Sequence, residues 1–207
     1  MFAELQQRKA LADEVPLKAV LRGHRGAVVL SMLLTWVLSA AIVVVILMTP
    51  TLLQTVYGFE AATALKANSL AIVLLSIGCV AAGVLSDRFG AGRVLLVGGL
   101  LLAASSWTFY TGLKANPDWL FPLYALTGLF VGTIGAVPYV MVRAFPAVVR
   151  FSGLSFSYNL AYAIFGGLTP MVVSLLMKWD SLGPAYYVAT LCGVAMLIGL
   201  FLIGKKR

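Results

Sequence analysis

The charged residues with the most informative spacing lie between Gly83 and Arg93, in the stretch GVLSDRFGAGR. Asp87 is the only acidic residue of this stretch and has Arg88 beside it, so its carboxylate should be ionised and paired with a cation. Gly83 should let its helix approach a neighbour, and Gly90 and Gly92 suit a tight chain reversal, because glycine adopts backbone angles that other residues avoid. We expect a short turn between two helices, in which Asp87 pairs with a nearby arginine or faces the N-terminus of a helix.

A second group of candidate residues is polar but uncharged, and its members recur three or four residues apart, which places them on single helix faces. Two such stripes occur: Ser155, Asn159, Tyr162 and Gly166; and Ser31, Thr35 and Ser39, with Trp36 beside them. An amide in lipid without a partner is costly, so Asn159 should face protein or a cavity. A ligand and a hydrogen bond to another helix would both satisfy it. The serine and threonine hydroxyls can instead bond to their own helix backbone.

The sequence offers no candidate catalytic centre, since it contains no nucleophile–base pair and no cluster of metal ligands. Cys79 and Cys192 lie inside apolar stretches without a CxxC motif, which predicts buried thiols rather than a disulfide or a metal site. His24, the only histidine, lies in a polar segment beside arginines and is expected at the solvated surface. We therefore expect no enzyme activity, no metal and no cofactor.

The elements that must position these residues are hydrophobic helices. The chain has 207 residues, of which 61% are hydrophobic and 11% charged, whereas a soluble domain carries about 25% charged residues. Uncharged stretches recur with lengths near the ~20 residues that span a hydrocarbon core, and in lipid they must be helical. These stretches are Ala27–Met48, Ala67–Leu85, Val94–Leu113, Trp119–Val142, Phe151–Met177 and Leu182–Gly204. The predicted fold is an all-α integral membrane protein, a bundle of six transmembrane helices.

The basic residues predict the orientation of this bundle. All but three of the 15 lysines and arginines fall on one side of it; the exceptions are Lys66, Lys114 and Lys178. The side rich in basic residues should be cytoplasmic, so both termini should be cytoplasmic. This gives a cytoplasmic segment 1–26, a membrane domain 27–204 and a cytoplasmic tail 205–207. The net charge of +8 is then a topological signal, and nucleic acid is not an expected partner.

Other residues indicate how the helices sit and pack. Aromatic residues near the predicted outer boundary are expected in the headgroup layer. They are Tyr57, Phe59, Trp107, Tyr110, Trp119, Trp179, Tyr186 and Tyr187. Small residues spaced by four should let helices approach closely. They are Gly128, Gly132 and Ala136 in one helix, and Gly153, Ser157 and Ala161 in the next. Pro138 and Pro170 should disturb these same two helices.

Two motifs resemble a known family. Gly83, Leu85, Asp87, Arg88 and Gly90 match the Gly-x-Leu-x-Asp-Arg-x-Gly-Arg-Arg signature of the major facilitator superfamily, except that Ala91 and Gly92 replace its final basic pair and Arg93 follows. The stretch FPAVVRFSG, residues 145–153, resembles the Phe-Pro-x-x-x-Arg-x-x-Gly entry to the eleventh helix in the metabolite:proton symporter branch. The likeness extends roughly from Pro16 to Gly204 and concerns the C-terminal half of such transporters.

The resemblance implies one half of a twelve-helix secondary transporter in the plasma (inner) membrane, moving a small polar metabolite such as a betaine, proline or a carboxylate with protons. It assigns a cytoplasmic latch to Gly83, Asp87, Arg88, Gly90, Arg93, Arg143 and Arg150. The predicted spans lack ionisable residues away from their ends, so proton-coupling groups would belong to the missing half. The residues left for substrate contact are Trp36, Thr35, Ser155, Asn159 and Tyr162.

Two alternatives remain open at this point: a self-contained six-helix carrier that acts as a homodimer, and a membrane scaffold that transports nothing. The partner would be the missing N-terminal half in the leading interpretation and a second copy of this chain in the first alternative. The residues do not specify the substrate, the coupling ion or whether Met1 is the natural start.

Overall fold

The computed structural model describes residues 16–205, and within them it contains six helical spans long and apolar enough to cross a membrane. The spans are Arg25–Thr55, Ala61–Phe89, Ala91–Ala115, Pro117–Ala144, Arg150–Met177 and Gly183–Gly204. The predicted six-helix membrane fold is thereby confirmed. Most spans exceed the uncharged stretches that predicted them, because basic residues such as Lys66 extend toward water from the end turns of a helix. Residues 1–15, Lys206 and Arg207 belong to the predicted cytoplasmic segments and lie outside the described residues.

Several of these spans consist of more than one helical segment. In chain order the elements are α2 (Pro16–Gly23), α3 (Arg25–Ile42), η1 (Val43–Met48), α4 (Thr49–Thr55), α5 (Ala61–Phe89), α6 (Ala91–Ala115), η2 (Pro117–Trp119), α7 (Leu120–Val131), η3 (Gly132–Gly135), α8 (Ala136–Ala144), α9 (Arg150–Ala161), η4 (Tyr162–Gly166), α10 (Gly167–Met177) and α11 (Gly183–Gly204). Segments η1 and η4 are π-helical, whereas η2 and η3 are 3₁₀-helical.

The irregular segments η1, η3 and η4 each precede a proline. Proline cannot donate to the carbonyl four residues earlier and its ring clashes with that carbonyl. The prolines are Pro50, Pro138 and Pro170, and the corresponding carbonyls belong to Ile46 in η1, Ile134 in η3 and Gly166 in η4. The disturbances predicted at Pro138 and Pro170 are therefore present, and each takes the form of a local change of helix type one turn before the ring.

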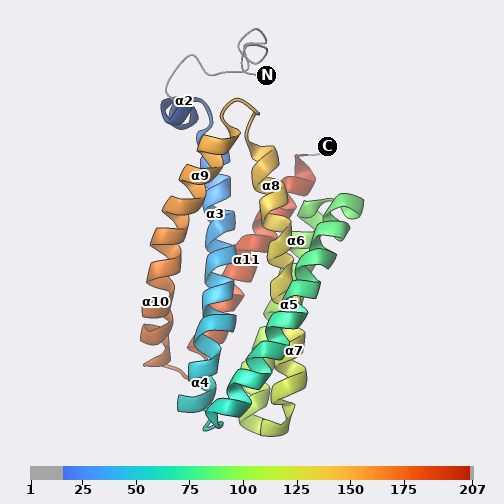
Figure 1. The fold of residues 1–207 in the computed structure, drawn as a ribbon, viewed down its shortest axis with the longest axis vertical. Helices are drawn as coiled ribbons and strands as arrows, with labels where there is room; N and C mark the ends of the chain where they lie inside the picture. Colours follow the sequence, from blue (N-terminus) through green and yellow to red (C-terminus); the bar gives the residue numbers. More distant parts are fainter. Residues whose placement is uncertain (1–15, 206–207) are drawn as a thin grey trace.

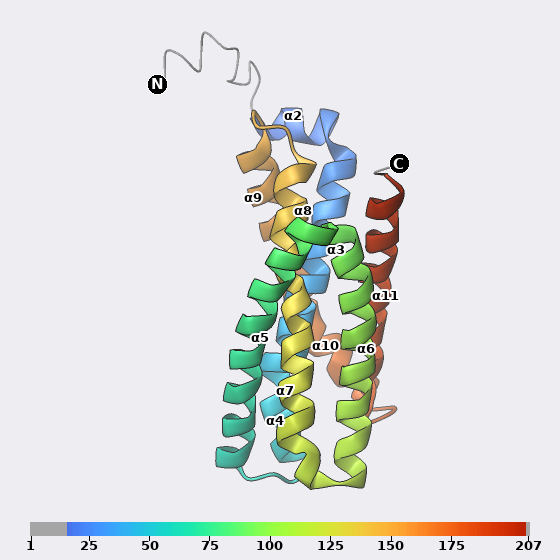
Figure 2. The ribbon, with the colours of Figure 1, turned by 90° about the vertical axis from the view of Figure 1, so that its right-hand side faces the viewer.

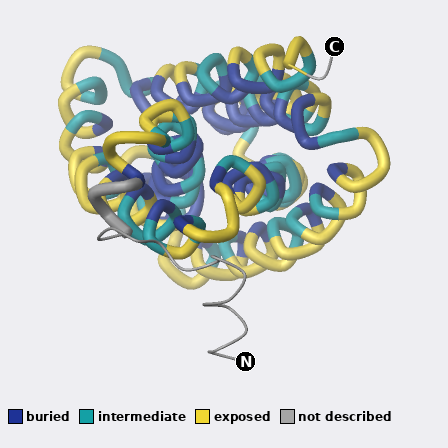
Figure 3. Tube along the Cα trace, turned by 90° about the horizontal axis from the view of Figure 1, so that it is seen from above, coloured by how far each residue is buried: buried dark blue, intermediate teal, exposed yellow. Residues whose placement is uncertain are grey.

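The spans form a bundle with a buried centre and two exposed flanks. In Figure 1 the span α9–η4–α10 lies on one side, α5 lies on the other, and α3 and α8 lie between them. Figure 2 shows α7 between α5 and α6, with α11 beside α6. Viewed along the bundle, the buried residues cluster at its centre (Figure 3). The two flanking spans are the least buried of the six, so they offer the most surface to lipid or to another protein.

The predicted close approach of helices at small residues is confirmed. A Cβ atom on Gly132 of α7–η3 would collide with the backbone of Gly78 in α5, and one on Gly128 would collide with the carbonyl oxygen of Ala71. The small residues of α9 are also buried, and a Cβ atom on Gly153 would meet the ring of Phe145 at 2.6 Å. Because lipid provides no hydrophobic drive between helices, such backbone proximity is a main source of packing energy.

The expected aromatic belt is only partly correct. Trp179 is 90% exposed, and Trp107, Trp119 and Tyr186 are also exposed at the expected end of the bundle. A place in the headgroup layer is wrong for Tyr110 and Tyr187, which are buried and bond through their hydroxyls to other helices. A tyrosine near a helix end can satisfy its hydroxyl either in the interface or inside the bundle, and the sequence does not distinguish the two.

The charge asymmetry and the fold together predict which loops face outward. Asp118 and Ala147 are exposed, and they lie at or just beyond opposite ends of the α7–α8 span. In a protein with Cys79 and Cys192 replaced by alanine, Asp118→Cys should react with a membrane-impermeant thiol reagent added outside intact cells. Ala147→Cys should react only after the membrane is opened. The reverse labelling pattern would overturn the orientation with both termini inside.

Candidate functional site

A polar and aromatic cluster joins α3, the α9–α10 span and α11. The indole ring of Trp36 stacks on Phe165 with centroids 4.9 Å apart and planes 22° apart. Its Nε1–H donates to the hydroxyl of Tyr187 at 3.1 Å. The hydroxyls of Tyr187 and Thr169 lie 3.0 Å apart, and Thr169 donates to the carbonyl of Phe165 at 2.5 Å. The hydrogen bonds thus run from Trp36 through Tyr187 and Thr169 to the helix backbone, which fixes the orientation of the indole.

The local sequence explains why this cluster forms at η4. Pro170 has no N–H for the carbonyl of Gly166, and the chain in front of it widens into a π-helical turn over Tyr162–Gly166. Such turns often occur at functional sites, because they redirect side chains that a regular helix would place elsewhere. Gly166 has no side chain, and a Cβ atom there would lie 3.3 Å from the ring of Tyr162 and 3.9 Å from Ser39. The widened turn therefore packs closely on α3.

Asn159 and Tyr162 are exposed on this flanking span, and Ser155 is half-buried one turn before Asn159. The Nδ2 of Asn159 donates to the carbonyl of Ser155 at 2.8 Å. Within residues 16–205 Asn159 makes no hydrogen bond to another helix. The alternative that it links two helices therefore finds no support within this chain. The ring of Tyr162 lies 5.5 Å from that of Tyr158. Together these residues form a polar, aromatic face that the chain itself leaves uncovered.

The predicted stripe on α3 has a different environment. Ser31, Thr35 and Ser39 are completely buried. Thr35 donates to the carbonyl of Ser31 at 2.8 Å and lies 3.8 Å from the sulfur of Met141 in α8, so the structure does not bring it together with Asn159 and Tyr162. Of the α3 candidates, Trp36 alone reaches the polar cluster. The structure thus separates the five predicted contact residues into a packed Thr35 and a group that lies on or beside the uncovered face.

Three members of the cluster were not predicted: Phe165, Thr169 and Tyr187. A second polar group was also missed, in which the hydroxyl of Tyr124 lies 2.6 Å from the carbonyl of Val45 and 2.5 Å from Oδ1 of Asn68. The rule that singled out Asn159, an amide inside an apolar stretch, applies equally to Asn68 and could have found it. No sequence signal marks Thr169, whose role depends on the π-helical turn.

The predicted latch residues lie toward the other end of the bundle, and most of them surround the α5–α6 turn. Arg150 does not join them, because it begins α9 on the opposite flank (Figure 1). Gly90 has a φ of 87°, which confirms that the reversal needs glycine at this position. The same expectation is wrong for Gly92, which has no positive φ and instead allows α11 to pack closely, since a Cβ atom there would lie 2.9 Å from the carbonyl oxygen of Gly199. Asp87 and Arg93 are exposed. The guanidinium of Arg143 lies 4.1 Å from the ring centroid of Tyr139.

No ion pair involves Asp87 among the residues that the structure describes, so the expected pairing is absent from this conformation. Arg88 lies against the ring of Phe89, with its guanidinium carbon 5.3 Å from the centroid. Arg150 donates from Nε to the carbonyl of Phe145 at 3.2 Å. The expected approach of a neighbouring helix at Gly83 is wrong, since a Cβ atom added there would meet no other atom within 4 Å. Arg88, Arg143 and Arg150 are thus held by rings and carbonyls rather than by Asp87.

The loop before α11 holds the start of that helix in place. The N–H of Leu182 and the hydroxyl of Tyr186 each donate to the carboxylate of Asp180 at 2.9 Å. These bonds, the backbone one above all, hold the pKa of the Asp180 carboxyl below its ordinary value. Asp180 therefore stays ionised at neutral pH and anchors the turn from which Tyr187 enters the bundle.

Comparison with known proteins gives two kinds of result. No protein-family model matches the chain, and no solved structure matches it. Among curated proteins, it is 31% identical over 183 residues to a citrate-proton symporter of Klebsiella pneumoniae, a match that covers 85% of this chain and 41% of that protein. It is 31% identical over 202 residues to a citrate-proton symporter of Salmonella typhi, covering 94% of this chain and 46% of that protein.

An ectoine/proline transporter of Corynebacterium glutamicum is 29% identical to the chain over 163 residues, or 72% of this chain and 31% of the transporter. The chain thus spans less than half the length of the curated relatives it matches. These relatives are transporters rather than enzymes, which agrees with the absence of a candidate catalytic centre from the sequence.

The Trp36–Tyr187–Thr169 chain of hydrogen bonds predicts a difference between two neighbouring tyrosines. Tyr187→Phe should reduce the free energy of unfolding by about 1–3 kcal/mol, because it leaves the part-buried indole N–H without an acceptor. Tyr186→Phe should cost less, since water can replace its hydroxyl at the exposed Asp180 contact. Equilibrium unfolding in mixed micelles would measure both. Equal effects of the two substitutions would show that the hydrogen bonds of Tyr187 do not stabilise the cluster.

Proposed function

This chain belongs to the metabolite:proton symporter branch of the major facilitator superfamily, and we propose that it forms the C-terminal six-helix half of a secondary transporter. The observation that carries the proposal is the uncovered polar face of α9 and η4, where Asn159 and Tyr162 are exposed within a membrane span. The amide N–H of Asn159 is bonded to the carbonyl of Ser155, but the described residues provide no partner for the Tyr162 hydroxyl, and an unpartnered polar group in lipid costs about 1–3 kcal/mol. A second six-helix unit laid against this face would remove that cost and enclose a site at mid-membrane depth, where transporters bind their substrates.

Trp36, Ser155, Asn159 and Tyr162 are the residues we propose for substrate contact. Aromatic faces attract quaternary ammonium groups, and an amide or phenol hydroxyl can donate to a carboxylate. This wall contains no charged side chain, so it suits a zwitterion of zero net charge, such as a betaine or proline. A tricarboxylate such as citrate would need cations from the other half, because isolated charges are costly in a membrane interior. The same argument assigns the proton-coupling groups to the other half.

The proposed function predicts that this chain alone does not transport. Purified chain in liposomes with an imposed proton gradient should show no saturable uptake of radiolabelled proline, glycine betaine or citrate. Liposomes that also contain a matching N-terminal half should take up one of them. Saturable uptake by the chain alone would contradict the half-transporter and would favour the homodimer. No uptake and no complex with any N-terminal half would favour a scaffold.

A second part of the proposal is a latch, formed around the α5–α6 turn by Gly83, Asp87, Arg88, Gly90, Arg93 and Arg143, with Arg150 at the start of α9 as its member on the opposite flank. Asp87 is exposed there, so its carboxylate is free to meet a partner in a different conformation or on the other half. The positive end of a helix dipole is one such partner. A contact of this kind forms in one state of the transport cycle and breaks in the other. It therefore affects the ratio of inward-open to outward-open molecules rather than the free energy of unfolding.

In the assembled transporter, Asp87→Asn should change the ratio of inward-open to outward-open molecules about fivefold, the effect of about 1 kcal/mol. The matched control is Asp118→Asn, because Asp118 is also an exposed aspartate but lies at the opposite end of the bundle. Cysteine accessibility at each face would report the ratio, and thermal unfolding should be unchanged. An unchanged ratio with normal transport would rule out the latch.

A further inference from the structure

An apolar groove runs between α5 and α6, with residues of α7 and η3 at its base. Its volume is about 460 Å³, and its walls include Ala81, Leu85, Val97 and Leu101. It reaches from Phe89, at the end of α5, to Gly78, eleven residues earlier. Eleven residues of α-helix rise about 16 Å, which is close to half of the ~30 Å hydrocarbon core. The groove thus has the depth of one leaflet.

A second cavity of about 530 Å³ adjoins the groove at the end of the bundle, and the two share Phe89 and Arg93. Three cations line this second cavity: Arg93 from α6, Arg143 from α8 and Lys205 after α11. Its wall also contains the backbone of residues 90–92, where the long helix α6 begins. No acidic residue lines it among the residues that the structure describes. Apolar side chains such as Leu30, Val140 and Leu202 form the rest of the wall.

We propose that these two cavities form one binding site for an anionic phospholipid, with the headgroup phosphate against Arg93, Arg143 and Lys205 and one acyl chain in the groove between α5 and α6. Charge complementarity supports the headgroup position, since three cations converge without an anion. Basic pockets between helix ends on the cytoplasmic side of a membrane bind anionic headgroups. Arg143 is already oriented by its contact with the ring of Tyr139, so part of the binding surface exists before the lipid arrives.

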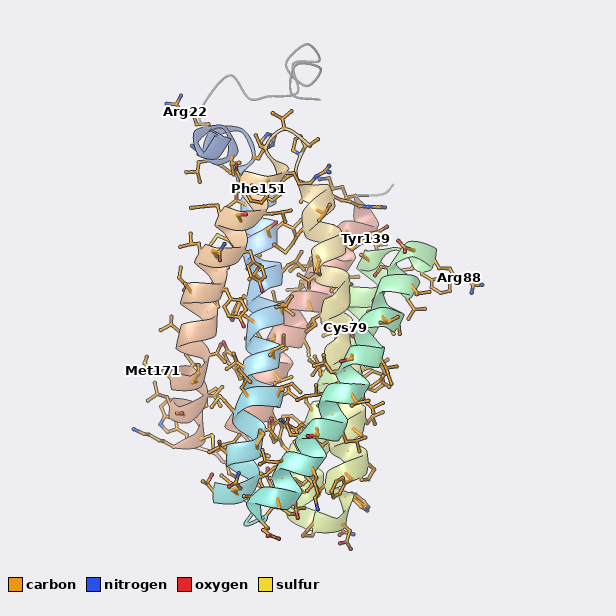
Figure 4. All side chains as sticks on the ribbon, viewed as in Figure 1. Arg22, Cys79, Arg88, Tyr139, Phe151 and Met171 are labelled. Atoms are coloured by element: carbon orange, nitrogen blue, oxygen red, sulfur yellow. The ribbon has the colours of Figure 1, made fainter. Side chains whose placement is uncertain are left out.

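The apolar groove distinguishes a lipid from a small soluble anion. A free phosphate would bind only in the basic cavity and would make no use of the groove. An acyl chain matches the groove both in length and in its apolar walls. The site is also distinct from the polar face of α9 and η4, because it lies on α5, α6 and α8. The lipid proposal therefore does not depend on which substrate is transported. Arg88 provides an internal comparison, since it lies on the same turn but points away from the bundle (Figure 4).

The test is native mass spectrometry of the full chain released from detergent micelles and titrated with phosphatidylglycerol, with phosphatidylcholine of the same acyl chains, and with inorganic phosphate. Phosphatidylglycerol should bind more tightly than phosphatidylcholine. The double variant Arg93→Gln, Arg143→Gln should weaken phosphatidylglycerol binding about twenty-fivefold, from about fivefold for each cation. Arg88→Gln, which removes the same charge outside the cavity, should change it less than about twofold.

A second pair of variants tests the groove without altering charge. Ala81→Phe should fill the groove and weaken phosphatidylglycerol binding, whereas Ala62→Phe, at an exposed position of the same helix, should not. All variants should keep the melting temperature of the parent protein. If Arg88→Gln and the double variant lost equal affinity for phosphatidylglycerol, the lipid would be held by a general attraction to surface charge, which would contradict a defined site. Displacement of the lipid by inorganic phosphate, or its release when a second six-helix protein binds, would show that a soluble anion or a protein occupies the cavity and would overturn the proposal.

Discussion

The structure depends on one constraint: polar groups must find hydrogen-bond partners inside a bundle whose spans carry charges only near their ends. Most partners are local. Thr35 donates to Ser31 and Asn159 to Ser155, each one turn back along its own helix. Only a few polar contacts cross between helices, and most of these are made by tyrosines, as in the contacts of Tyr187 with Trp36 and Thr169. The side-chain hydroxyl oxygen of Ser31 is buried without a partner among the described residues, so not every polar group satisfies this constraint.

Three prolines connect this constraint to the shape of the helices. Each of the three irregular segments, η1, η3 and η4, contains the carbonyl that a proline leaves without its usual donor. At η4 the consequence reaches the candidate site, because the widened turn carries Tyr162 and Phe165 and packs against α3 through Gly166. On the other flank, glycines of α7 bring its backbone into close contact with that of α5. A bundle with one tightly packed flank and one irregular, polar flank suits a unit that works against a partner.

The sequence predicted the spans well, whereas the structure agrees with only part of its grouping of candidate site residues, and the reasons differ. Uncharged stretches reveal spans because charge is excluded from hydrocarbon, yet they end too early because residues such as Lys66 extend to water from within a helix. Asn159 and Tyr162 were grouped because their spacing puts them on one helix face, and both are exposed in the structure; their contact with substrate stays a prediction. Tyr187 was misplaced in the headgroup layer because depth alone does not reveal whether a hydroxyl faces water or Trp36. Thr35 was grouped with the site by spacing, and only packing against Met141 separates it.

The central claim of this account is that Asn159 faces a substrate pathway completed by a second six-helix unit. The most direct measurement uses Asn159→Cys in an assembled transporter without other cysteines, held in a lipid bilayer. The account predicts that a water-soluble maleimide labels this position from one side of the membrane and that transported substrate protects it. Labelling only by a reagent that partitions into lipid, with no protection by substrate, would show that this face lies against the bilayer and would contradict the account.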